Sequence, residues 1–307
     1  MYLITGGAGF IGSHLVEALI ERGERVRVLD DFSTGRRENL AAVADHIELL
    51  EGDVADPEIA ERAVAGCDYV LHLAAIASVQ ASLKAPRHTH RVNVDGTLNV
   101  LDAAQRAGVR RVVFASSAAV YGDHTALPLR EELPPRPLSP YAASKAVGEA
   151  YCCAFHASYS LPTVALRFFN VYGPRQDPAS PYSGVISIFA ARMARGECPV
   201  IYGDGKQTRD FVYVADVVRA MLLAYERETA IGDAFNVGGG GQTSVLQLAA
   251  ALNQVLDTAL TPTFAPARTS EVRFSQADVR RAQEVLGWES QVPLREGLSR
   301  LIGAEYR

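Results

Sequence analysis

The feature that most constrains the fold is a glycine-rich turn near the start of the chain. Residues 4–12 read Ile-Thr-Gly-Gly-Ala-Gly-Phe-Ile-Gly, between an apolar run and an amphipathic helical pattern. Glycines at 6, 9 and 12 allow a sharp turn close to a pyrophosphate, and the helix N-terminus offers N–H groups to it. A purely structural turn could use the same triplet. However, Asp30 ends the next strand, close to the expected spacing of about 20 residues, so we expect Gly6, Gly9 and Gly12 to bind a dinucleotide.

Asp30 also indicates which dinucleotide is bound. A carboxylate at this position can accept hydrogen bonds from both ribose hydroxyls and would repel a 2′-phosphate, which favours NAD over NADP. Arg36 and Arg37 argue for NADP instead, because either guanidinium could bind its 2′-phosphate.

The alternation of apolar runs with helical patterns predicts the fold class. Strands are expected at 2–5, 25–29, 47–51, 69–73, 111–116 and 163–169. Helices are expected at 12–22, 57–65, 91–107 and 141–159. Continuously apolar strands indicate burial on both faces, and hence a doubly wound parallel α/β sheet. We expect a dinucleotide-binding domain at 1–169 and a smaller α/β substrate domain at 170–307, with segments near 211–238 returning to the sheet.

Composition excludes several classes of function. The 307 residues carry a net charge of −5, which argues against a nucleic-acid-binding protein. No apolar run approaches 18 residues, so we expect no membrane span, and no basic leader precedes the first strand. The four cysteines form no C-x-x-C pair, so we expect neither a disulfide framework nor a metal site, and a reducing cytoplasm is the simplest compartment.

Two segments carry candidate catalytic side chains. Tyr141 and Lys145 form Tyr-x-x-x-Lys at the start of an expected helix, a spacing that places both on one face. Lowering the pKa of a phenol by about 3 units takes about 4 kcal/mol, which a lysine ammonium and a nicotinamide cation together can supply. Ser117, after the fifth strand, could hydrogen-bond the same substrate oxygen. Each feature alone also fits an ordinary helix face or a helix cap.

Several motifs together resemble the extended short-chain dehydrogenase/reductase family, and within it the UDP-glucose 4-epimerases. Besides the glycine turn and the Tyr141 segment, they are His72-Leu73-Ala74-Ala75, Ser116 to Gly122, Arg167 to Pro174, Gly203 to Phe211 and Ala277 to Trp288. The resemblance implies that Tyr141 is the acid/base, that Lys145 activates it and binds the nicotinamide ribose, and that Ser117 is their hydroxyl partner.

The resemblance also implies the lining of the NAD site. The expected residues are Phe10, Ile11, Asp30, Asp31, Phe32, Ser33, Thr34, Gly35, Asp53, Val54, Leu73, Ala74, Ala75, Ile76, Ala77, Asn93 and Phe169. Ala77 departs from the family, which often carries a lysine there near the phosphates, so the resemblance does not imply a lysine contact at this position.

For the nucleotide sugar, arginines of the second domain suit the diphosphate. We expect Arg209 and Arg268 to bind it, Asn170 to donate to it and Glu271 to accept from a ribose hydroxyl. By resemblance, Val200, Ile201 and Tyr202 border the base, with Val185 nearby. By the same resemblance Ser275 borders the sugar's 2-substituent, where a small side chain leaves room for an N-acetyl group.

Together these features predict NAD-dependent inversion of carbon 4 of a UDP-hexose. Related dehydratases and decarboxylases carry acidic residues just after the serine, where this chain has Ala118 and Ala119. In the expected mechanism Tyr141 removes the 4-hydroxyl proton as hydride leaves carbon 4, the 4-keto sugar turns over, and both are returned. The alternatives are a dehydratase or another net redox enzyme, and a non-catalytic NAD sensor. By analogy, helices 91–107 and 141–159 would form a homodimer interface.

Overall fold

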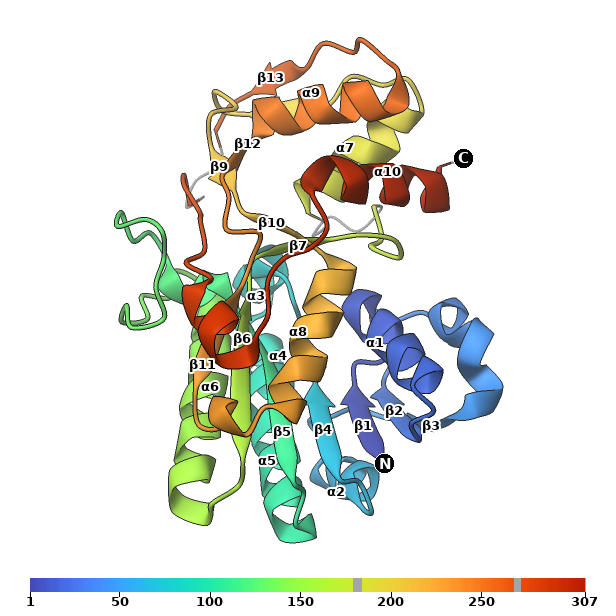
Figure 1. Cartoon of the computed structure of the whole chain (residues 1–307), viewed down its shortest axis with the longest axis vertical. Helices are drawn as coiled ribbons and strands as arrows, with labels where there is room; N and C mark the ends of the chain where they lie inside the picture. The colour runs from blue at the N-terminus through green and yellow to red at the C-terminus, as the bar shows by residue number, and fades with distance from the viewer. Residues whose placement is uncertain (179–183, 268–271, 307) are drawn as a thin grey trace.

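A parallel sheet of seven strands forms the centre of the fold (Figure 1). The computed structural model describes residues 1–178, 184–267 and 272–306. All neighbouring strands of this sheet run parallel. In spatial order they are β11 (Ala234–Val237), β6 (Thr163–Phe168), β5 (Arg111–Ser117), β4 (Tyr69–His72), β1 (Tyr2–Thr5), β2 (Val26–Asp30) and β3 (Ile47–Glu51). The predicted doubly wound parallel sheet is confirmed, and its strand order reverses between β1 and β4, where such sheets bind ligands.

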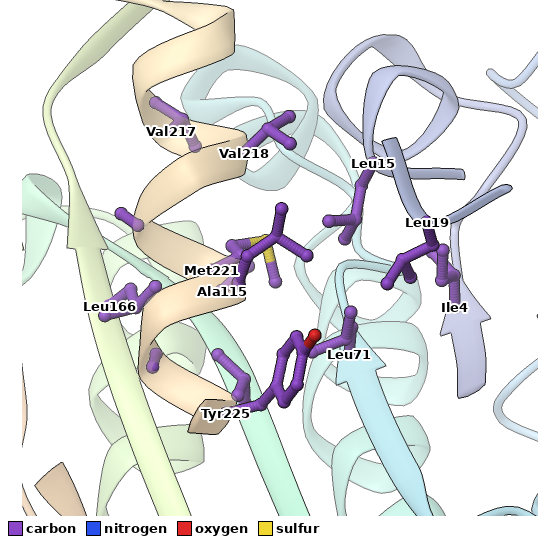
Figure 2. Packing of buried hydrophobic residues seen from close by; sticks show 14 of the residues in the cluster. Ile4, Leu15, Leu19, Leu71, Ala115, Leu166, Val217, Val218, Met221 and Tyr225 are labelled. Atoms are coloured by element: carbon purple, nitrogen blue, oxygen red, sulfur yellow. The ribbon is translucent and has the colours of Figure 1, made fainter. Parts of the chain in front are cut away.

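Helices α1 (Phe10–Glu21) and α8 (Val214–Glu226) cover one face of the sheet (Figure 1). Leu15 and Leu19 lie one turn apart on α1, and Figure 2 shows them near Met221 of α8, above the strands. All three side chains are fully buried. Full burial of one leucine side chain contributes about 1.5–3 kcal/mol. The packing of Leu15 and Leu19 against Met221 therefore stabilises the layer that α1 and α8 form on the sheet.

Three helices cover the opposite face: α2 (Pro57–Val64), α5 (Gly96–Ala107) and α6 (Pro140–Tyr159). The start of α2 is fixed by Asp56, whose side chain accepts hydrogen bonds from the backbone N–H groups of Glu58 and Ile59. The helix expected at 91–107 has two parts, because a π-helical turn, η2 (Arg91–Asp95), leads into α5.

Three further helices and three two-stranded sheets lie beyond the carboxyl ends of the strands, toward the upper part of Figure 1. Helices α7 (Val185–Ala194), α9 (Val245–Leu256) and α10 (Leu294–Glu305) share a separate apolar core. The pairs are β7 (Asn170–Tyr172) with β10 (Phe211–Tyr213), β8 (Val200–Tyr202) with β13 (Thr263–Ala265), and β9 (Thr208–Arg209) with β12 (Thr243–Ser244). The predicted boundary between residues 169 and 170 therefore falls between β6 and β7.

Other elements differ from the expectation or add to it. β3 lies at the sheet edge and Leu49 is 41% exposed, so this strand is not buried on both faces. Two short helices, α3 (Val79–Lys84) and α4 (Pro86–His90), precede η2 and were not predicted. Short 3-10 and π segments complete the fold: η1 (Arg37–His46), η3 (Ala118–Tyr121), η4 (Glu228–Ala230) and η5 (Ala282–Leu286).

Candidate active site

The glycine turn places the start of α1 at the carboxyl edge of the sheet. Gly6 has φ +70°, and a Cβ atom on it would lie 2.8 Å from the backbone nitrogen of Ala74. A Cβ atom on Gly12 would lie 2.1 Å from the carbonyl oxygen of Gly6. Gly9 caps α1 without a side-chain hydrogen bond, so the first N–H groups of the helix are not covered by a side chain. This cradle of backbone fits a pyrophosphate.

Phe10 and Ile11 follow the turn as the first residues of α1. Both are half-buried and pack against the apolar core of the upper helices. Ile11 also contacts the core beneath α8. The side chain of Ile11 therefore connects the two cores, while the N-terminal end of α1 faces the edge of the sheet.

Asp30 joins the glycine turn to the loop after β2. One carboxylate oxygen accepts from the backbone N–H of Ala8 at 2.8 Å, and the other accepts from that of Phe32 at 2.9 Å. Burial raises the pKa of Asp30, and these two N–H groups oppose the rise. A Cβ atom on Gly35 would lie 2.7 Å from Asp30 Oδ1, so glycine keeps space open beside the carboxylate.

Neighbouring residues of this loop are more exposed. The Asp31 carboxylate accepts from the backbone and the hydroxyl of Ser33, at 2.9 and 2.6 Å, which closes a local turn. Thr34 is exposed, and Phe32 is half-buried beneath the guanidinium of Arg37, 4.1 Å from the ring centroid.

Both arginines that opposed the choice of NAD are paired with carboxylates. Arg36 lies 2.6 Å from Asp177 Oδ2, and Arg37 forms an ion pair with Glu51. In each pair the carboxylate balances the positive charge of the arginine, which a 2′-phosphate would need as its partner. The local electrostatics therefore agree with the preference for NAD that Asp30 indicates.

A buried chain of hydrogen bonds crosses the carboxyl ends of β1 and β4. The Thr97 hydroxyl donates to the Asn93 carbonyl at 2.6 Å, so it accepts from His72 Nε2 at 3.0 Å. His72 Nδ1 then accepts from the Thr5 hydroxyl at 2.6 Å, and that hydroxyl accepts from the Ala74 backbone N–H at 3.2 Å. Burial lowers the pKa of His72 to about 3, so the ring is neutral with its proton on Nε2.

Asn93 connects the loop after β4 with the helix that carries the candidate catalytic residues. Its Oδ1 accepts from the Ile76 backbone N–H at 2.7 Å, and its Nδ2 donates to Ser144 Oγ at 2.9 Å. Ser144 in turn donates to the carbonyl of Tyr141 at 2.8 Å. Asn93 is 3% exposed, so its amide positions these segments from within the protein.

The rest of the loop after β4 lies at the surface of this edge. Leu73, Ala74, Ala75 and Ile76 are half-buried and Ala77 is exposed. Ala74 and Ala75 are small, so their side chains leave space at the strand ends.

Asp53 and Val54, which are expected beside the adenine, follow the end of β3. Asp53 accepts from the Ala55 backbone N–H at 2.9 Å and pairs with Arg91 at 2.6 Å. Val54 is 4% exposed and packs so closely on α5 that a Cβ on Gly96 would lie 2.7 Å from Val54 Cγ1. The Val54 side chain therefore belongs to the core, because α5 approaches it over a glycine.

Ser117 and Tyr141 meet where β5 ends and α6 begins. Ser139 caps α6 by accepting from the Ala142 backbone N–H at 3.1 Å, which orients the first turn that carries Tyr141. Burial raises the pKa of the Tyr141 phenol, while its hydrogen bond with the Ser117 side chain lowers it. The phenol is thus held next to a hydroxyl at the edge of the sheet that also carries the glycine turn.

Lys145 lies one turn further along α6 and is 4% exposed. Its Nζ donates to the Ala115 carbonyl at 2.7 Å and lies 4.9 Å from the centroid of the Phe114 ring. Burial lowers the pKa of Lys145 to about 8. In the chain alone, burial raises the pKa of Tyr141, and the expected lowering of that pKa involves a nicotinamide cation in addition to this ammonium.

The residues expected at the nucleotide lie on several elements of the upper part. Asn170 opens β7 and its backbone N–H donates to the Asp210 carbonyl at 3.0 Å. Phe169, just before it, is 5% exposed and packs against Tyr121. Arg209 lies on β9, and its guanidinium donates to the Thr208 carbonyl at 2.8 Å.

The expected base-binding strand is β8. Its side chains alternate: Ile201 is fully buried in the upper core, whereas Val200 is half-buried and Tyr202 is 39% exposed. The side chain of Ile201 therefore points away from any surface site, because the period of a strand is two. Val185, the first residue of α7, is half-buried.

Ser275 is 8% exposed, and the segment around it is held from both sides. The Arg273 carbonyl accepts from the Thr208 backbone N–H at 2.9 Å, and the Gln276 carbonyl accepts from that of Leu129 at 2.8 Å. Arg268 and Glu271, the other two residues expected near the nucleotide, lie outside the described residues.

One positioning group that sequence analysis missed is Asp210. It is fully buried and accepts backbone N–H groups from Ala277 at 2.8 Å and from Gly240 at 3.0 Å. Burial raises its pKa to about 7. Asp210 thereby ties the segments at 238–241 and 275–277 to β9 and β10. A carboxylate directly before the apolar run Phe211 to Tyr213 was the signal for it.

The chain offers no evident metal site in the portion that the structure describes. Across residues 1–178, 184–267 and 272–306, no three His, Cys, Asp or Glu side chains cluster as ligands would. No described helix is both long and apolar enough to cross a membrane.

Comparison with known proteins identifies close relatives. The NAD-dependent epimerase/dehydratase family matches residues 2–238. A UDP-glucose 4-epimerase of Mycolicibacterium smegmatis is 42% identical over 98% of this chain and 96% of its own length. UDP-glucuronic acid decarboxylase 1 of Arabidopsis thaliana is 37% identical over 98% of this chain and 68% of its own length.

Solved structures similar to this chain include two epimerases. A UDP-glucose 4-epimerase of Thermotoga maritima with UDP-glucose superposes with a TM-score of 0.94, at 42% identity, over 99% of this chain and 97% of that one. A UDP-N-acetylglucosamine 4-epimerase of Methanobrevibacter ruminantium, in complex with UDP-N-acetylmuramic acid, gives 0.95 at 37% identity, with the same coverages.

Proposed function

The chain belongs to the NAD-dependent epimerase/dehydratase family, as an NAD-dependent enzyme similar to UDP-glucose 4-epimerases, and we propose that it inverts carbon 4 of a UDP-hexose. The sugars are UDP-glucose and UDP-galactose, and the pair UDP-GlcNAc and UDP-GalNAc as well. The reaction passes through a transient 4-keto sugar and has no net redox change.

The observation that carries this proposal is the Tyr141–Ser117 pair at the end of β5, followed by two side chains that cannot transfer protons. Ala118 and Ala119 begin η3 directly after Ser117, and the Ala119 backbone N–H donates to Ser117 Oγ at 3.2 Å. Elimination of water or loss of carboxylate would call for an additional acid or base at this point. Proton transfer at one hydroxyl requires only the phenol that is present.

The chain's own residues account for the proton steps. Bound NAD supplies the acceptor for the hydride of carbon 4 and the donor that returns it. Tyr141, deprotonated, takes the proton of the 4-hydroxyl, and gives it back to the same oxygen after the sugar has turned. Ser117 donates to that oxygen and holds it beside the phenol. Lys145, by its charge and its place one turn along α6, favours the phenolate.

The nucleotide must stay bound while the sugar turns over. The enzyme should therefore bind the substrate mainly through its diphosphate and base. We propose Arg209, Arg268 and Asn170 for the diphosphate, Glu271 for the ribose, and Val200, Tyr202 and the backbone of Ile201 for the base. Ser275 would border the 2-substituent, and a serine there leaves space for an N-acetyl group.

We also propose a homodimer formed through α5 and α6. One side of α6 presents Val147, Ala150 and Ala154 to solvent at helical spacing, and Val147 is 39% exposed. On the neighbouring α3, Leu83 is 54% exposed. A Val147→Glu variant should sediment as a monomer while the wild type sediments as a dimer, whereas Leu49→Glu on edge strand β3 should leave the dimer intact.

The reaction itself is tested by product analysis without added reductant. Purified protein with NAD is incubated separately with UDP-glucose and UDP-GlcNAc, and the nucleotide sugars are separated. The proposal expects the galacto epimer in each case, with no accumulation of free NADH. A 4-keto-6-deoxy sugar would point to a dehydratase instead, and a pentose from UDP-glucuronic acid would point to a decarboxylase. Absence of every conversion would favour a non-catalytic NAD sensor.

A further inference from the structure

Two polar contacts attach helix α6 to the end of β5: one is made by Lys145 and the other by Glu149. Glu149 lies one turn after Lys145 on the same helix face and accepts from Ser116 Oγ at 2.5 Å. Lys145 is bonded to the carbonyl of Ala115, the residue before Ser116. Both contacts therefore fix α6 within two residues of Ser117, the partner of Tyr141.

Glu149 is in turn held by a nearly buried arginine. Arg167 Nε donates to Glu149 Oε1 at 2.9 Å and Nη2 donates to Oε2 at 2.8 Å, a bidentate pair. The side chains are 12% and 6% exposed for Glu149 and Arg167. Arg167 Nη1 also donates to the Tyr121 hydroxyl at 2.9 Å and to the Glu131 carbonyl at 3.1 Å. The carboxylate thus cannot leave its place below Lys145 without breaking a chain of contacts.

We propose that Glu149 is a positioning residue whose negative charge, fixed by Arg167 and Ser116, keeps Lys145 an ammonium ion at the pH at which the enzyme works. This role rests on the proposed function, because a charged Lys145 matters to the reaction only if Tyr141 is the acid/base. The placement itself does not depend on which sugar is converted. Arg167 limits the effect, since its positive charge offsets part of the carboxylate's field at Lys145.

The groups around Lys145 support this assignment. Within α6 the neighbouring titratable groups are Tyr141, Glu149 and Cys152, and from β4 the ring of His72 is close enough to be affected by Lys145. His72 is neutral, and burial raises the pKa of Cys152, so this thiol is uncharged near neutral pH. Glu149 is therefore the anion of this group. Burial of Lys145 opposes its charge, Cys152 and then Glu149 act against that effect, and of these two neighbours Glu149 is the one held in an ion pair.

The chain allows a direct measurement, because it contains only three lysines, and the other two, Lys84 and Lys206, are exposed. Protein labelled with ¹³C at lysine Cε is titrated by NMR between pH 6 and 11, and Lys84→Arg and Lys206→Arg assign the signals. We expect the Lys145 signal to titrate near 8.

Two substitutions at Glu149 separate charge from shape. Glu149→Gln keeps the size and the bond to Ser116 but removes the charge, and should lower the pKa of Lys145 by about one unit. Glu149→Asp keeps the charge and should restore most of that shift. Arg167→Gln should move the pKa of Lys145 upward, opposite to Glu149→Gln. Glu17→Gln is the matched control, because it breaks the Glu17–Arg175 pair on α1 and should leave Lys145 unchanged.

A purely structural role for Glu149 predicts a different pattern. Glu149→Gln would then resemble wild type more closely than Glu149→Asp, and any shift from Arg167→Gln would have the same sign as that from Glu149→Gln. Either result overturns the proposal, as does an unchanged Lys145 titration in a folded Glu149→Gln variant. If Arg167→Gln does not fold, the two Glu149 variants still decide. The titration needs no substrate, so failure of the proposed reaction is judged separately, from the product analysis.

In the epimerase assay the same variants should shift the alkaline limb of kcat. Glu149→Gln should move that limb to lower pH, and Glu149→Asp should keep it near the wild-type position. A proportional loss of kcat at all pH values, with an unshifted limb, would contradict a role through Lys145.

Discussion

Gly148 of α6 lies directly against the ring of Phe114 in β5, so closely that a Cβ atom on Gly148 would stand 2.4 Å from Phe114 Cζ. The ring is buried and stacks on His72, with 5.8 Å between the ring centroids. The absence of a side chain at 148 therefore sets how near α6 approaches β5. That approach lets Lys145 reach the Ala115 carbonyl and lets Tyr141 reach Ser117.

Gly148→Ala should displace α6 from β5. Because the ring of Phe114 is enclosed, we expect the free energy of unfolding to fall by about 1–3 kcal/mol, as in other overpacked cores. The value of kcat should fall with it, since the phenol and the ammonium move together. Chemical denaturation and initial rates measure the two effects.

Gly303→Ala is the matched control for this substitution. Gly303 lies in α10 with open space around the position of its Cβ, so alanine should stabilise the helix by roughly 0.5–1 kcal/mol. If both alanine variants change stability alike, close packing at Phe114 is not what Gly148 provides.

Tyr141→Phe should remove the proton transfer and little else. We expect kcat to fall by about 10²- to 10⁴-fold, the usual contribution of a general acid/base, with NAD affinity changed only slightly. Tyr151→Phe, on the same helix but packed in the apolar layer, serves as control and should keep activity. A Tyr141→Phe variant that retains more than a tenth of the wild-type rate would argue for another base.

Local pattern predicted the fold and much of the candidate site, because the decisive signals lie within short segments. The glycines before α1, Asp30 at the end of β2 and the Tyr141–Lys145 spacing each follow from a few neighbouring residues. Ser144 could not be found this way, because its role depends on Asn93, which is distant in sequence. The same holds for Asp177, which balances Arg36.

For some expected site residues, tertiary packing decides which part of the residue faces the core. Ile201 was expected beside the base, yet its side chain fills the upper core, because strand β8 turns that side inward. Val54 likewise packs under α5, where Gly96 admits it. Burial raises the pKa of the Tyr141 phenol in the chain alone, whereas the expected lowering of that pKa involves a bound nicotinamide cation as well as Lys145.

Ser275→Tyr should narrow the range of sugars. A phenol ring at this nearly buried position would fill the space that serine leaves beside the 2-substituent. We expect turnover of UDP-GlcNAc to fall at least roughly tenfold relative to that of UDP-glucose, because only the larger substituent meets the ring. The ratio of kcat/KM for the two sugars is the readout, so a general loss of stability does not mimic the effect. Ser275→Ala should leave the ratio unchanged, and an unchanged ratio in Ser275→Tyr would place the 2-substituent elsewhere.

His72 should make stability fall in mild acid. Its pKa is lowered to about 3 in the folded protein, against about 6.5 when unfolded, so between these values only the unfolded chain binds the proton. The neutral ring's contribution is thus complete above pH 6.5 and is lost progressively toward pH 3. From pH 6.5 to 5 this costs about 2 kcal/mol.

His72→Gln should be less stable than wild type at pH 7.5, because Thr5 and Thr97 then share one good hydrogen-bond partner in place of the two ring nitrogens. The stability of this variant should, however, decline less steeply from pH 6.5 to 5. Other groups titrate equally in both proteins, so the difference between their denaturation midpoints across this range isolates His72. Parallel curves would mean that the ring is already protonated when folded, and the assigned direction of the Thr5–His72–Thr97 chain would then be wrong.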